Sequence, residues 1–188
     1  MKRKSSVGIV GALAALLLAA LPAFANEIER FSGFGVHLQG KGRGQVIVGI
    51  ERWSTDEERQ KYLEILRDHG QAALIKALED GPRVGYIRLA SSRAIELKYA
   101  RSTDLPDGTR RVVIATNRFI GFNEAITSTR SQHYDFSIAE MRFPKGEKGE
   151  GKLAPATAIS INKETNQLEL ENYGIEPVRM SSITAKKP

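Results

Sequence analysis

The best candidates for binding or catalysis in this chain are charged and aromatic residues that interrupt apolar, strand-like runs. Carboxylate, guanidinium and phenol groups that converge in a pocket could bind a polar ligand or exchange protons with it, because buried charges must be paired. The alternative is that these residues form the solvent face of an antiparallel sheet and pair across strands. The candidate ligand-binding residues are Trp53, Tyr86, Arg88, Glu96, Tyr99 and Arg111.

Other common catalytic chemistries find little support in the sequence. The chain has no cysteine, which excludes a disulfide, a thiol nucleophile and a thiolate metal site. His37, His69 and His133 stand far apart and form no metal-binding motif such as HExxH. No G-x-S-x-G pattern marks a nucleophilic serine. We therefore expect neither a metal site nor a cofactor, and the catalytic residues, if there are any, stay unassigned.

Glycine repeats near the start of the chain resemble phosphate-binding loops only in composition. Gly33-x-Gly35 and Gly40-x-Gly42-x-Gly44 lead into another strand-like run. A dinucleotide-binding loop passes from a strand into a helix, whose N-terminus then meets the phosphate. These glycines therefore predict hairpin turns, with an anion-binding nest of backbone amides as the alternative.

One strand and the helical region that follows it organise the rest of the chain. The β-branched residues of Gly44–Trp53 predict a strand that is partly covered on both faces. Ser54 and Glu57 then have the spacing of a capping box, with Ser54 as the N-cap. At this junction Trp53 is either a core residue or part of a pocket wall.

The helical region contains a glycine in its apolar stripe. Gly70 costs about 1 kcal/mol against alanine inside a helix, yet glycine is favoured just after a helix end. The pattern therefore predicts two short helices, Thr55–His69 and Gln71–Glu79, bent at Gly70. One kinked helix is the alternative.

Most of the remaining chain reads as short strands separated by turns, after a loose start at Asn26–Arg30. About nine strands and one helical pair (about 55–79) predict an α+β chain of mostly antiparallel sheet, curled into a barrel or a two-layer structure. A barrel that closes around a helical plug or lid is the first expectation. Besides Gly44–Trp53, the predicted strands are Phe31–Gln39, Val84–Ala90, Ala94–Arg101, Arg110–Thr116, Tyr134–Phe143, Ala156–Asn162, Gln167–Asn172 and Pro177–Ile183.

One hairpin bears directly on the candidate site. A strong turn signal at Pro106-Asp107-Gly108 predicts that Ala94–Thr116 forms an antiparallel hairpin. Pairing around this turn should bring Glu96 or Lys98 close to the register of the charges that begin at Arg110. The strand charges would then lie in one region of the sheet.

The first residues have the features of a secretory signal peptide. A basic start is followed by the apolar run Val7–Leu21, and Ala23-Phe24-Ala25 forms a cleavage pattern. The run is shorter than the roughly 20 residues that a membrane-spanning helix needs. We expect residues 1–25 to be removed and 26–188 to form a single β-rich domain that is periplasmic or secreted and not membrane-spanning. An uncleaved membrane anchor is the alternative.

The basic charge of the chain does not indicate nucleic-acid binding. Three of the 28 basic residues, and none of the 22 acidic ones, lie in the predicted leader. The remaining balance is only mildly basic, so we expect no nucleic-acid partner.

Five short motifs together resemble a family of uncharacterised exported bacterial proteins. The resemblance covers most of the predicted mature chain and implies a bacterial envelope setting, but it carries no known activity. The motifs are Ile50-Glu51-Arg52-Trp53-Ser54-Thr55, Gly85-Tyr86-Ile87-Arg88, Arg110-Arg111-Val112-Val113, Gly149-Glu150-Gly151-Lys152-Leu153 and Glu171-Asn172-Tyr173-Gly174.

The expected function is that of a small exported envelope β-domain that binds a small ligand or an envelope protein without a cofactor. The alternative is a cofactor-independent hydrolase or isomerase whose Glu/Arg/Tyr pocket performs general acid–base chemistry. The sequence favours the binding protein over the enzyme.

Overall fold

The computed structural model describes residues 27–37, 43–89, 92–120, 136–155, 157–162, 164–165, 167–172 and 177–187. The predicted leader 1–25 and most of the glycine-rich turn at Gly40–Gly44 lie outside these residues. The elements are β1 (Glu29–His37), β2 (Arg43–Ile50), α1 (Asp56–Glu79), β3 (Gly85–Leu89), β4 (Ile95–Leu97), β5 (Tyr99–Asp104), β6 (Arg110–Thr116), β7 (Ser137–Phe143), β8 (Gly149–Ala154), β9 (Thr157–Asn162), β10 (Gln167–Asn172) and β11 (Val178–Lys186).

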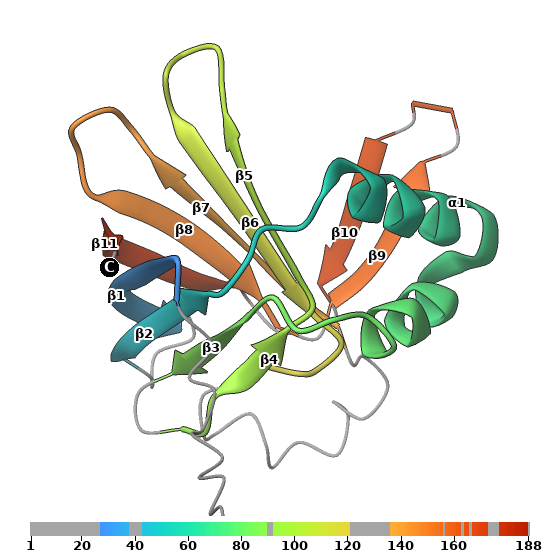
Figure 1. Cartoon of the computed structure of the whole chain (residues 1–188), viewed down its shortest axis with the longest axis horizontal. Coiled ribbons are helices and arrows are strands. Elements are labelled where there is room, and N and C mark those ends of the chain that lie inside the picture. Colours follow the sequence, from blue (N-terminus) through green and yellow to red (C-terminus); the bar gives the residue numbers. More distant parts are fainter. Residues whose placement is uncertain are drawn as a thin grey trace, which may run out of the picture.

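Nine of the strands form one antiparallel sheet that nearly closes on itself (Figure 1). The strand order is β4-β3-β2-β1-β11-β8-β7-β6-β5, and β9 and β10 form a separate two-stranded sheet. The two end strands, β4 and β5, are consecutive in the chain and are separated only by Lys98. The predicted fold class, an α+β chain with a mostly antiparallel sheet curled into a barrel-like form, is confirmed.

The seam of the barrel-like sheet lies at Lys98. The Lys98 amide donates to the Ala115 carbonyl at 3.0 Å, and the Thr116 hydroxyl donates to the Glu96 carbonyl at 2.8 Å. One continuous segment therefore pairs with β3 before Lys98 and with β6 after it.

This change of partner corrects the predicted hairpin over Ala94–Thr116. Only Tyr99–Asp104 pairs with β6 around the Pro106-Asp107-Gly108 turn, whereas Glu96 lies opposite Tyr86 of β3. The charges at the start of β6 face Asp104 and Thr103 instead. Local alternation is the same whichever strand is the partner, so the sequence did not reveal the switch.

The interior of the barrel-like sheet is packed with apolar side chains. Period-two alternation places one face of each strand inward, which removes its Val, Ile, Leu and Met side chains from water. Fully buried members of this core include Phe31, Val48, Ile50, Ile87, Leu97, Val112, Ile114, Met141, Leu153, Val178 and Met180.

Helix α1 packs against the outside of the sheet and does not plug it, which corrects the expectation of a helical plug or lid. Its buried stripe of Leu66, Leu74 and Leu78 forms a second core with Ala115 of β6 and Ile159 of β9. Figure 1 shows α1, β9 and β10 together on one side of the sheet. The strand side chains already fill the interior, so the apolar face of the helix is buried on the outer wall.

The predicted bend at Gly70 is confirmed. Gly70 has φ 78° and ψ −176°, which lies outside the helical region and in a conformation that glycine adopts most easily. After the bend, the Gln71 side chain accepts from the Ile159 amide at 2.9 Å and donates to the Thr157 carbonyl at 3.2 Å. The second half of α1 is therefore tied to β9.

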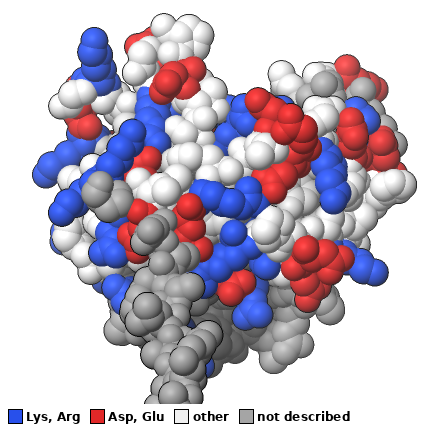
Figure 2. Space-filling view, in the orientation of Figure 1, with Lys and Arg blue, Asp and Glu red and all other residues white. Residues whose placement is uncertain are grey.

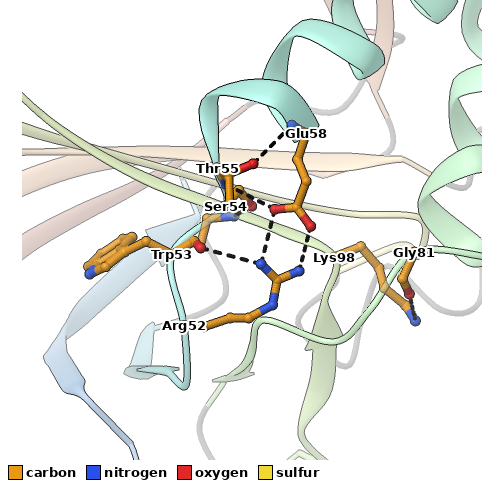
Figure 3. Close-up of polar contacts among 8 residues, drawn as sticks. Arg52, Trp53, Ser54, Thr55, Glu58, Gly81 and Lys98 are labelled. Atoms are coloured by element: carbon orange, nitrogen blue, oxygen red, sulfur yellow. Dashed lines mark hydrogen bonds and ion pairs between the residues drawn. The ribbon is translucent and has the colours of Figure 1, made fainter.

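The predicted cap at Ser54 is wrong by one residue. Thr55 is the N-cap, because its hydroxyl accepts from the Glu58 amide at 3.2 Å while the Glu58 carboxylate accepts from the Thr55 amide at 2.9 Å (Figure 3). Arg52 also donates two hydrogen bonds to Glu58, and these lower the pKa of that carboxyl.

Ser54 is buried and serves the sheet instead of the helix. Its amide donates to the Ala100 carbonyl at 2.7 Å, and its hydroxyl accepts from the Ala100 amide at 3.1 Å. These two bonds satisfy backbone groups of β5 next to the seam, where an unpaired buried group would be costly. A capping pattern alone does not show that Ser54 forms hydrogen bonds with Ala100 instead of capping the helix.

Replacing Thr55 should therefore weaken the helix start. Thr55→Ala removes the N-cap acceptor and should lower the free energy of unfolding by about 0.5–2 kcal/mol. Thr55→Ser keeps the hydroxyl and is the matched control, with an expected change near zero. Urea melts of the two variants measure the difference. Equal midpoints would show that the Thr55 hydroxyl does not cap α1.

Candidate functional site

The six candidate residues lie in three separate places and do not form one pocket. Two groups lie on the outer face of the sheet, where their strands alternate with buried neighbours, and the third place is beside the interior core. The groups are Tyr86, Arg88 and Glu96 on β3–β4, Tyr99 and Arg111 on β5–β6, and Trp53 before α1.

Tyr86 belongs to a polar group whose members already satisfy one another. Its hydroxyl donates to the Glu27 carboxylate at 2.6 Å, and Arg30 donates to the same carboxylate through two bonds of 2.8 Å. The bond from Arg30 is the main cause that lowers the pKa of Glu27, while burial raises the pKa of Tyr86. The Tyr86 ring also covers Gly49, where a side chain would collide with it. This Glu/Arg/Tyr group therefore links the start of β1 to β3 across β2, and its carboxylate is not a free base.

Arg88 and Glu96 point into solvent. Arg88 is exposed and has no ion-pair partner among the described residues. The Glu96 side chain is 54% exposed and lies 3.6 Å from Lys98 and 3.8 Å from Arg83. Exposed ion pairs of this kind contribute at most about 1 kcal/mol, so the geometry around Glu96 is that of a solvated sheet face.

Trp53 packs beside a buried ion pair that the sequence analysis missed. Arg110 donates to both oxygens of Glu29 at 2.6 and 2.7 Å and to the Ser102 hydroxyl at 2.7 Å. Its guanidinium lies 5.6 Å from the Trp53 ring centre and 5.7 Å from that of Phe31. Hydrogen bonding to Glu29 raises the pKa of Arg110.

The Glu29–Arg110 pair is a clamp across the barrel-like sheet. In the strand order β1 and β6 are separated by β11, β8 and β7, so the pair joins opposite walls. Glu29 is only 2% exposed, and both of its oxygens are occupied. The predicted loose start at Asn26–Arg30 is wrong for Glu29 and Arg30, which begin β1. The signal was present in the alternation Glu29-x-Phe31, which places both residues on the inward face.

Breaking this clamp should cost far more than breaking an exposed pair. Glu29→Gln leaves the Arg110 guanidinium without its counter-ion, which should lower the free energy of unfolding by about 3 kcal/mol. Glu140→Gln is the matched control, because the Glu140–Arg142 pair is partly exposed and should cost under about 1 kcal/mol. Urea melts compare the two. Similar losses in both variants would contradict the role of the clamp.

Arginine side chains gather on the outer face of β5, β6 and β7, beside the first half of α1. Arg111 lies directly opposite Thr103 of β5 and Arg142 of β7. Arg101 lies opposite Val113, one step from Arg111 on the same face. Like charges in neighbouring cross-strand positions repel, so this arrangement needs counter-charges.

Two of these arginines have counter-charges and one does not. Arg101 pairs with Asp56 at 2.6 Å, and Arg142 pairs with Glu140 at 2.6 Å. Arg111 has no ion pair with any described residue, and its buried Nε has no hydrogen-bond partner. Buried donors are rarely left unpaired in proteins, so Nε of Arg111 is a donor that a ligand could satisfy.

Tyr99 completes the site, which we call the outer arginine site: Arg59, Tyr99, Arg101, Arg111 and Arg142. The Tyr99 ring meets the Tyr62 ring edge-on, with centroids 6.3 Å apart. Burial raises the pKa of Tyr99, while the positive charges of Arg101, Arg59 and Arg111 oppose that shift. The phenol stays protonated at neutral pH and can donate a hydrogen bond.

The candidate residues from the sequence included Tyr99 and Arg111 but not Arg59, Arg101 or Arg142. Alternation along β5 already places Tyr99 and Arg101 on one face. Arg59 comes from α1, and nothing in the sequence indicates that the start of the helix lies against β5.

A separate groove of about 450 Å³ lies between the second half of α1 and the segment after β6. It contains none of the six candidate residues. Its lining residues are Ile75, Glu79, Asn117, Arg118 and Phe119.

Within the described ranges, no cluster of His, Asp or Glu side chains has the arrangement of a metal site. The only helix in the same ranges, α1, is too polar to cross a membrane.

No protein-family model, curated protein or solved structure matches the chain. The resemblance to exported bacterial proteins therefore stays a prediction.

Proposed function

We propose that the protein is a small exported β-domain of the bacterial envelope that binds an anionic small molecule at the outer arginine site without a cofactor. The ligand class is one that carries carboxylate or phosphate groups. The export part of this proposal rests on the leader-like residues 1–25.

The observation that carries the proposal is the unpaired guanidinium of Arg111. Arg101 and Arg142 on either side already have carboxylate partners, whereas Arg111 has none among the described residues. A guanidinium binds a carboxylate or phosphate through parallel hydrogen bonds, so an oxyanion would supply the missing partner.

A site on the outer wall agrees with the packing of the interior. The inward side chains form a dense apolar core, and the Glu29–Arg110 clamp bridges opposite walls. A polar ligand inside would have to displace buried apolar groups, whereas the outer arginine site exposes charge to water. The sheet serves as a rigid scaffold for this site.

The groups at the site support binding better than acid–base catalysis. A general base needs a carboxylate or imidazole with free lone pairs near the substrate. The nearby carboxylates, Asp56 and Glu140, are each held by an arginine at 2.6 Å. The protonated phenol of Tyr99 is a hydrogen-bond donor and not a base at neutral pH, so the hydrolase or isomerase alternative has less support.

Replacing Arg111 should weaken the binding of oxyanions. Citrate and inorganic phosphate, titrated at constant ionic strength and followed by calorimetry, should bind about tenfold more weakly to Arg111→Gln, because a charge-assisted hydrogen bond is lost. Arg111→Lys keeps the charge without the planar fork and should be intermediate.

Arg88→Gln is the matched control for this titration, because Arg88 is an exposed arginine on β3 that is not part of the outer arginine site and has no ion pair with a described residue. It should leave the affinity unchanged. Equal loss of affinity in the Arg88 and Arg111 variants would show that only the net positive charge of the protein matters. That result would refute a site at Arg111.

Export is tested independently of ligand binding. Cells that express the full chain should release a mature protein that begins at Asn26, because Ala23-Phe24-Ala25 has the small-residue cleavage pattern. Intact-mass analysis of the periplasmic and membrane fractions measures the cleavage. Recovery of the uncleaved chain in the membrane fraction would contradict the proposal.

A further inference from the structure

A second outer surface combines exposed apolar side chains with unpaired cations. Phe34 is 46% exposed and Val36 is 39% exposed, and both point outward from β1. Strand β1 lies in the middle of the sheet, between β2 and β11, so these side chains are not at a frayed edge. Neighbouring exposed apolar residues on a rigid surface commonly mark an interaction site.

Three cations lie in register with this apolar pair. Val36 is directly opposite Arg43 of β2 on one side and Arg179 of β11 on the other, and Arg179 is opposite Lys152 of β8. The Arg43 guanidinium also lies 5.6 Å from the centre of the Phe34 ring. We call these five residues the β1 platform: Phe34, Val36, Arg43, Lys152 and Arg179.

The β1 platform carries uncompensated positive charge. Arg43, Lys152 and Arg179 are exposed, and none forms an ion pair with a described residue. The cross-strand neighbour of Lys152 on β7 is Glu140, which already pairs with Arg142. Figure 2 shows Lys and Arg side chains, with some acidic ones among them, on the side of the molecule where β8, β11 and β1 lie.

The position of β1 limits the kind of partner that fits. Its backbone pairs with β2 and with β11 over most of its length, so an extended peptide cannot add to it as a strand. A partner must instead meet side chains that project from the outer wall of a curved sheet. A bilayer surface fits this shape, because apolar side chains enter the headgroup boundary while Lys and Arg contact lipid phosphates.

We propose that the β1 platform docks the protein onto a bilayer with anionic headgroups. Phe34 and Val36 enter the interface, and Arg43, Arg179 and Lys152 bind the lipid phosphates around them. This surface shares no residue with the outer arginine site on β5–β7, although Lys152 of β8 lies opposite Glu140 of β7 at the border between them.

Vesicle sedimentation tests the proposal on the protein as it is recovered from expressing cells. The probes are vesicles of phosphatidylglycerol and phosphatidylethanolamine, compared with vesicles of phosphatidylcholine alone. The protein should bind the anionic vesicles and lose binding as salt rises. Arg179→Gln and Lys152→Gln should each weaken binding about fivefold, as expected for one surface cation, and Phe34→Ser should weaken it by a similar factor.

Two matched controls carry the same substitutions elsewhere on the surface. Leu170→Ser changes an apolar residue of β10 that is 44% exposed, and Arg118→Gln changes an exposed arginine beside α1. Neither should alter vesicle binding. Arg111→Gln should also leave it unchanged, which separates this inference from the proposed anion site.

Fluorescence gives a second readout that does not depend on affinity. In Phe34→Trp the new indole should shift its emission to shorter wavelength on anionic vesicles, after subtraction of the signal of Trp53, the single native tryptophan.

Three outcomes would overturn the proposal. These are equal binding to phosphatidylcholine vesicles, unchanged binding by the Phe34 and Arg179 variants, and absence of the emission shift. If a polyglutamate peptide binds through the same residues while vesicles do not, the platform belongs to an acidic protein partner and the lipid proposal is wrong.

Discussion

The seam at Lys98 is the constraint on which the rest of the molecule depends. One continuous segment pairs with β3 before this residue and with β6 after it, so the two ends of the sheet meet. Ser54 and Thr116 supply hydrogen bonds on either side of the seam. Because the sheet nearly closes, every strand has an inner and an outer face. Alternate side chains along a strand therefore point either into the core or to the outside.

Closure also determines where polar chemistry can lie. The small interior is filled by apolar side chains, and the inward-pointing Glu29 and Arg110 form an ion pair, with Ser102 as a further acceptor for Arg110. Helix α1 therefore packs outside, and its first turn comes close to the arginines of β5 and β6. The two surfaces with unpaired charge, around Arg111 and around Arg179, both lie on the outer wall.

The two surfaces also differ in character. Around Arg111 the cations surround a buried donor and a phenol, an arrangement that suits a small oxyanion. Around Arg179 the cations flank exposed Phe34 and Val36, an arrangement that suits an extended surface. They share no residue but adjoin on the outer wall, because Lys152 of β8 lies opposite Glu140 of β7, the ion-pair partner of Arg142.

The sequence by itself determined the local features of this protein. Alternation identified most strands, the Pro106-Asp107-Gly108 turn located a hairpin, and Gly70 marked the bend in α1, because each depends on neighbours in the chain. Only the tertiary structure decided which strand pairs with Glu96, which of Ser54 and Thr55 is the N-cap of α1, and on which side of the sheet the helix packs. The same holds for Arg110 and Arg111: alternation separates adjacent residues onto opposite faces, but only closure of the sheet decides which face is the interior. Arg110 therefore became the inward-facing member of the clamp and Arg111 the outward-facing arginine without an ion pair among the described residues, because the partners of each come from strands far apart in sequence.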